Sequence, residues 1–117
     1  MRPERLYLLD ILEASQSIRR FTAGIQEPEF LQNDMLQSAV LQKLTIIGEA
    51  ASKLDPVFTA RNPQVPWRDI VAFRNIAVHA YFSVEWSIVW VAATEETPTL
   101  SDQVAAIVAR EFPGEEP

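Results

Sequence analysis

The sequence has no cysteine, a single histidine and only three glycines among its 117 residues. The lack of cysteine excludes disulfides and thiolate metal sites. Three glycines are too few for a glycine-rich phosphate loop, and no such motif occurs. Apolar runs such as residues 88–93 are far too short to span a bilayer, and the first residues show no signal-peptide core. We therefore expect a soluble cytoplasmic protein that has no membrane partner and needs no cofactor.

Acidic residues are in excess, with a formal net charge of -6. Such a balance argues against simple electrostatic capture of nucleic acid, which needs a basic surface. The charge is uneven, however. Residues 61–81 carry three arginines against Asp69 alone, whereas residues 82–117 carry seven acids against Arg110. The single histidine, His79, lies in the net-positive stretch.

Composition and periodicity predict an all-α fold, an antiparallel bundle of four to five helices. Apolar residues make up 48% of the chain and charged residues 22%, as in globular proteins. No segment shows strand alternation with hairpin chemistry. The length suits one domain over residues 1–112, and the proline- and glutamate-rich residues 113–117 are expected to form a disordered tail.

Apolar residues at steps of three and four place the individual helices. A first helix over residues 3–22 should bury a stripe in which Ser15 fills one place. A second should run from an Asp34 N-cap, with Gln37 as its capping-box partner, to about Leu54. Gly48 inside it would permit close approach by a neighbour.

Proline and serine place the later helices. Residues 27–29 form a connector, with at most one helical turn. A short helix should follow Asp55, and another should start near Pro66. Ser83 is expected to cap a further helix, and the Thr97–Pro98 pair marks a kink or a fresh start. The three tryptophans, which contribute mainly burial, are expected to anchor the core or an interface.

Residues 74–81 read Arg-Asn-Ile-Ala-Val-His-Ala-Tyr. The segment brings together a permanent cation, a side chain that titrates near neutrality and a phenol. Five residues on an ideal helix correspond to about 140° of rotation, so Arg74, His79 and Tyr81 cannot share one face of an unbroken helix. Either the helix ends near His79 and lets Tyr81 turn back, or a second copy of the chain completes the site.

Few kinds of chemistry are open to this segment. One histidine without a carboxylate cluster cannot build a metal site, and no serine or cysteine nucleophile has a recognisable partner. Metal-independent acid–base chemistry on a phosphodiester remains. His79 would move the proton, and Arg74 would bind the phosphate and its developing charge. In a purely structural role, the same residues would form a surface ion pair, a local hydrogen bond and a helix-end contact.

The pattern Arg-x4-His-x-Tyr, with Asn75 after the arginine, resembles the signature of the HEPN superfamily, specifically its HepT-like toxins. The resemblance extends over residues 4–108 and includes four further stretches: Arg5–Glu13, Ala39–Ala51, Val65–Ile70 and Tyr81–Trp90. It implies an all-helical homodimer with a ribonuclease site at the dimer cleft. Catalysis would rest on Arg74 and His79 with Asn75 in support, and the nucleophile would be the 2′-hydroxyl of the RNA.

The same resemblance implies a toxin–antitoxin pair. The usual partner is a minimal nucleotidyltransferase antitoxin that transfers AMP from ATP onto the motif tyrosine, here Tyr81. Added bulk and negative charge would then block the cleft to RNA. Ala80 departs from the family, which often has glycine there to ease a turn with positive φ. Because many HEPN domains have lost catalysis, a non-catalytic module that binds a nucleotidyltransferase or a nucleotide is the alternative, ahead of a bundle with no site.

Overall fold

The computed structural model describes residues 2–114, and in this range the chain is helical with no strand. The elements, in chain order, are α1 (Glu4–Thr22), α2 (Glu27–Phe30), α3 (Asp34–Ser52), α4 (Pro56–Arg61), α5 (Trp67–His79), the 3₁₀ turn η1 (Tyr81–Ser83), α6 (Trp86–Val91), the π-helical turn η2 (Ala92–Glu96) and α7 (Thr97–Glu111). The predicted all-α class is confirmed, and so is the single turn at the connector.

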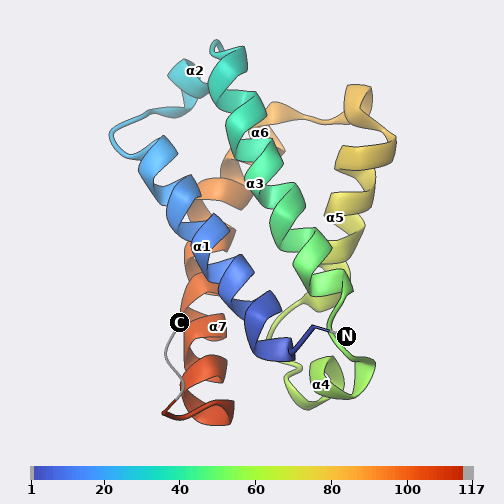
Figure 1. Cartoon of the computed structure of the whole chain (residues 1–117). Helices are drawn as coiled ribbons and strands as arrows, with labels where there is room; N and C mark the ends of the chain where they lie inside the picture. Colours follow the sequence, from blue (N-terminus) through green and yellow to red (C-terminus); the bar gives the residue numbers. More distant parts are fainter. Residues whose placement is uncertain (1, 115–117) are drawn as a thin grey trace.

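The long helices form an antiparallel bundle (Figure 1). Helix α3 packs against α1 on one side and α5 on the other, and α7 packs against α1. Leu8, Ile11 and Ile18 on α1 are fully buried, as their spacing predicts. Ser15 lies on the same buried face and satisfies its hydroxyl by donating to the carbonyl oxygen of Ile11 at 2.8 Å. The core is thus built along α3, which reaches the motif helix α5.

Two helix starts differ from their prediction. Asn33, not Asp34, caps α3, because its side-chain oxygen accepts from the Leu36 N–H at 3.0 Å. Gln37 makes no capping box; it is buried and donates to the carbonyl oxygen of Phe30. Ser83 does not cap α6 either, because it belongs to the turn η1 and α6 begins at Trp86. Asn33 thus takes the capping place predicted for Asp34, and Ser83 lies in η1, before α6 begins.

The Thr97–Pro98 pair marks the start of α7, as predicted, although no break in the helical backbone precedes it. The backbone instead widens into the π turn η2 and continues directly into α7, where proline occupies the first turn and needs no N–H partner. The Thr97 hydroxyl donates to the carbonyl oxygen of Ala92 at 2.7 Å and helps to close the wide turn. Of the predicted tail, Pro113 and Gly114 form a turn, and the rest lies outside the described residues.

A buried polar network fixes the start of α5. Asn62 is fully buried, and its carbonyl oxygen accepts from the Trp67 indole N–H at 2.9 Å. Its side-chain amide donates to the Phe58 carbonyl oxygen and to the Glu111 carboxylate of α7. A hydrogen bond from Arg61 holds the pKa of Glu111 below its usual range, with Asn62 adding to the effect. Trp67 therefore anchors the motif helix, as predicted for the tryptophans.

Candidate functional site

Helix α5 ends at the motif histidine. His79 is its last residue, Ala80 follows with φ -139°, and Tyr81 begins the turn η1. The helix thus ends near His79, as the first of the two arrangements left open by the sequence requires. The Ala80 N–H donates to the Ile76 carbonyl oxygen at 2.8 Å, so the helix end is hydrogen-bonded without a residue at positive φ. Alanine in place of the glycine common in the family is therefore unstrained here.

Arg74 is held from two directions. Its Nη2 donates to the Glu49 carboxylate on α3, and its Nη1 donates to the Asn75 side-chain oxygen at 2.7 Å. The Nε–H is buried and has no hydrogen-bond partner in the described chain. The side chain is still 24% exposed. A guanidinium has five N–H donors, so this one is oriented by the protein and keeps donors for an oxyanion.

Gly48 makes this arrangement possible. A Cβ built on Gly48 would overlap the Arg74 Cβ and lie 3.2 Å from the Ile70 carbonyl oxygen. The backbones of α3 and α5 therefore approach at the point where Arg74 leaves its helix. The predicted close approach at Gly48 is confirmed, and the neighbour is the motif arginine itself.

Glu49 is the site residue that sequence reasoning missed. It follows Gly48 on α3, and its second carboxylate oxygen lies 3.8 Å from the Lys53 Nζ one turn later. The carboxylate orients the guanidinium of Arg74 and balances its charge. A signal was present, because the glycine that admits a close neighbour stands beside an acid. Only the fold could say that the neighbour is an arginine.

His79 and Tyr81 are exposed, and neither side chain makes a hydrogen bond within residues 2–114. The Tyr81 ring packs edge-on against Phe82 and Trp86, with centroids 5.5 and 6.2 Å away. The Tyr81 hydroxyl has no hydrogen-bond partner within residues 2–114. One copy of the chain joins Arg74 to Asn75 but brings neither of them into hydrogen-bond contact with His79 or Tyr81.

Exposed apolar side chains gather around the motif. Among residues 2–114, six of the nine exposed large hydrophobic side chains fall between residues 76 and 91: Ile76, Val78, Tyr81, Phe82, Ile88 and Val91. Phe82 is 99% exposed. Leaving a phenylalanine fully in water forgoes roughly 1.5–3 kcal/mol of burial free energy. Apolar surface of this kind beside a functional motif is typical of an interaction site.

Residues 2–114 contain neither a metal-binding cluster nor a membrane-spanning helix. No group of three or more His, Asp or Glu side chains is placed to hold a metal ion. No helix in this range combines the length and the apolar content needed to cross a membrane.

Comparisons with known proteins show which family this chain resembles. A family model described as "Ribonuclease HepT-like" matches residues 11–107. Two archaeal relatives are "Putative RNase" from Methanocaldococcus jannaschii (35% identical, 91% of this chain, 97% of the relative) and "Probable ribonuclease HepT" from Thermococcus cleftensis (37% identical, 85% and 90%). A bacterial "Putative RNase" from Caldanaerobacter subterraneus is 33% identical over 95% of this chain and 99% of its own length. No solved structure matches.

The helical bundle with Arg-x4-His at the end of one helix is that of the HEPN superfamily. Within it, the chain belongs to the ribonuclease HepT-like family.

Proposed function

We propose that this protein is a metal-independent endoribonuclease toxin in which Arg74 and His79 catalyse the cleavage of RNA. The observation that carries the proposal is the fixed orientation of the Arg74 guanidinium on α5. Glu49 of α3 and Asn75 of α5 hold it, in a chain that belongs to a ribonuclease family. A guanidinium fixed in this way stabilises charge on a phosphate without reorganising during the reaction.

The proposed reaction is an internal displacement at phosphorus. The imidazole of His79 removes the proton of the RNA 2′-hydroxyl, and the 2′-oxygen attacks the adjacent phosphorus. Arg74 stabilises the negative charge that develops on the phosphoryl oxygens. The bond from phosphorus to the 5′-oxygen breaks, and that oxygen takes a proton from a protonated histidine. The products are a 2′,3′-cyclic phosphate and a 5′-hydroxyl, with no net gain or loss of protons.

Two proton transfers of opposite direction suit two histidines, and each chain has one. We therefore propose a homodimer in which the motif ends of two α5 helices face each other. The exposed apolar side chains around Phe82 supply surface for that contact. Isologous pairing would also bring two copies of Arg74 into one cleft and concentrate positive charge that an acidic monomer lacks.

Phe82→Asp should convert this dimer into a monomer and reduce RNA cleavage by at least about tenfold, because a charge would replace an apolar anchor at the interface. Met35→Asp is the matched control, since Met35 is 78% exposed at the start of α3. Sedimentation at micromolar concentration, with cleavage assayed in parallel, measures both effects. A wild-type monomer that still cleaves RNA would contradict the composite site.

We further propose that a minimal nucleotidyltransferase antitoxin silences the enzyme by transferring AMP from ATP onto Tyr81. The support is the unpartnered, exposed hydroxyl at the end of the motif helix. Its oxygen would attack the α-phosphorus of ATP, lose its proton and release pyrophosphate. The attached nucleotide would place bulk and negative charge where RNA phosphates bind.

Tyr81→Phe should keep most of the cleavage activity and escape silencing by the partner with ATP. A phenol is poorly suited to proton transfer at neutral pH, so its loss spares the proposed chemistry. Tyr7→Phe, at the only other tyrosine, is the matched control and should still be silenced. Intact-mass measurement after incubation should show an AMP-sized increase in the wild type and the control. The same increase in Tyr81→Phe would refute the assignment.

A further inference from the structure

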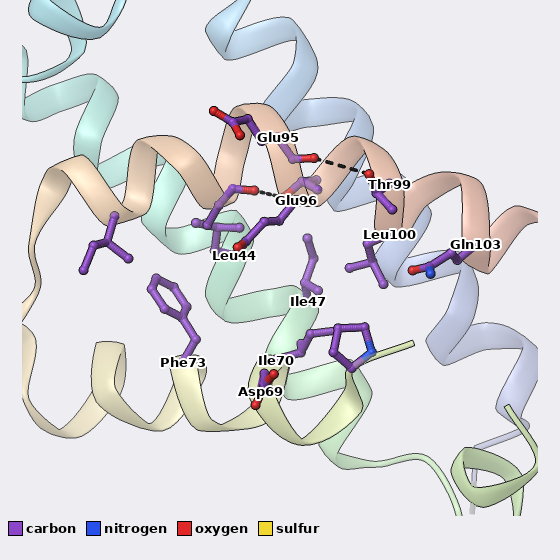
Figure 2. Close-up of a pocket in the computed structure, with 14 residues that line it drawn as sticks. Leu44, Ile47, Asp69, Ile70, Phe73, Glu95, Glu96, Thr99, Leu100 and Gln103 are labelled. Atoms are coloured by element: carbon purple, nitrogen blue, oxygen red, sulfur yellow. Dashed lines mark hydrogen bonds between the residues drawn. The ribbon is translucent and has the colours of Figure 1, made fainter. Parts of the chain in front are cut away.

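A concave surface lies along α5, and His79 does not line it. It is a groove of about 510 Å³, walled by α5 on one side and by the continuous run α6–η2–α7 on the other, with α3 as its floor (Figure 2). Ile70 on α5 lines the groove, and the nine residues from Ile70 to His79 correspond to about 180° of helix rotation.

The groove has an apolar floor. Figure 2 shows Phe73 projecting from α5 toward Leu44 of α3, with Ile47 and Leu100 further along. Wall residues run from Ile88 to Gln103, a length of roughly 22 Å at 1.5 Å per residue. That length spans about four helical turns, enough to lie along a helical segment of a partner.

Three carboxylates stand at the rim, and none is neutralised. Asp69 on α5 and the adjacent Glu95 and Glu96 of η2 all line the groove and are exposed. None of the three forms an ion pair within residues 2–114, and no lysine, arginine or histidine lines the groove. The π turn lets two consecutive glutamates reach the same groove; such turns often mark functional positions.

We propose that this groove binds a basic amphipathic helix of a partner protein. An apolar stripe on that helix would contact Phe73, Ile70 and Leu100, and flanking lysine or arginine side chains would reach the three carboxylates. The negative charge of the three rim carboxylates favours a basic helix, because these carboxylates attract a cationic segment and repel RNA phosphates. The groove is thus a protein-docking surface, and none of Arg74, His79 and Tyr81 lines it.

The probe is a synthetic 15-residue peptide with leucines at helical three- and four-residue steps and lysines beside them. Titrated into the isotope-labelled full chain, it should shift the amide signals of Ile70, Phe73 and Leu100 and leave those around His79 unchanged. A peptide with glutamate in place of each lysine should bind at least about tenfold more weakly, because it meets like charges at the rim.

Glu95→Lys with Glu96→Lys should weaken binding of the lysine peptide at least about tenfold. The matched control is Glu13→Lys with Asp102→Lys, which changes the net charge equally at exposed positions outside the groove and should change binding less than about threefold. Equal weakening by both double variants, shifts outside the groove or no binding at millimolar peptide would overturn the proposal. A change of oligomeric state in the groove variant would also overturn it, because the occupant would then be a second copy. RNA cleavage by the groove variant should be unchanged, so this test stands apart from that of the ribonuclease.

Discussion

His79→Ala and Arg74→Ala should each lower RNA cleavage by about a hundredfold or more and leave the helical fold intact. Loss of a general acid–base group costs roughly 10²–10⁴-fold in rate, and loss of one donor to a developing oxyanion about 10²–10³-fold. Neither side chain belongs to the buried apolar core: His79 is the exposed last residue of α5, and Arg74 is 24% exposed where α5 meets α3, so we expect the bundle to fold without them. Initial rates on a labelled RNA, with circular dichroism to check helicity, measure the effect.

Arg68→Ala is the matched control for the arginine. Arg68 lies on the same helix, is exposed and forms no ion pair within residues 2–114. Its removal changes the net charge by the same amount as Arg74→Ala, and it should change the cleavage rate by less than about threefold. If Arg68→Ala were as damaging as Arg74→Ala, general charge rather than the placed guanidinium would bind the RNA. Full activity in His79→Ala would rule out the proposed proton transfer.

Gly48→Ala should destabilise the protein, although alanine normally stabilises a helix interior by about 1 kcal/mol relative to glycine. The added Cβ would overlap the Arg74 Cβ, which is attached directly to the backbone and cannot move aside. Helices α3 and α5 must then separate, at a cost of roughly 1–3 kcal/mol. Separation would also loosen the contact between Glu49 and Arg74, so we expect cleavage to fall at least about tenfold.

Ser38→Ala, at an exposed position of the same helix, is the control and should be neutral or slightly stabilising. Chemical denaturation gives the free energy of unfolding of each variant, and the cleavage assay gives its rate. A stability gain in Gly48→Ala equal to the ordinary helix-propensity gain would show that the two helices are not held in contact at this point.

Much of the bundle was predictable because its helices carry regular apolar stripes. The N-cap of α4 at Asp55 and the start of α5 near Pro66 both follow from local chemistry that the fold leaves undisturbed. The predicted cap at Ser83 failed because the motif end turns through η1 first. The turn η2 could not be predicted, because a π turn adds one residue without any distinctive composition.

The candidate site was predictable only in part. The motif residues share one short segment, so sequence alone brought Arg74, Asn75, His79 and Tyr81 together as candidates. Glu49 lies 25 residues earlier and reaches Arg74 only because Gly48 lets two helices meet. Contacts of this kind depend on packing, which a single sequence does not display. The pairing of two motif helices across a dimer stays a prediction for the same reason.

We propose that Arg74 and His79 catalyse RNA cleavage in which the RNA's own 2′-hydroxyl is the nucleophile. The most direct test uses two oligonucleotides that differ only in one 2′-deoxy substitution at the mapped cleavage position, incubated with the full chain in EDTA. We predict cleavage of the all-ribose strand to a 2′,3′-cyclic phosphate and a 5′-hydroxyl, and no cleavage of the substituted strand at that position. Equal cleavage of both strands, or cleavage only after a divalent metal is added, would contradict this mechanism.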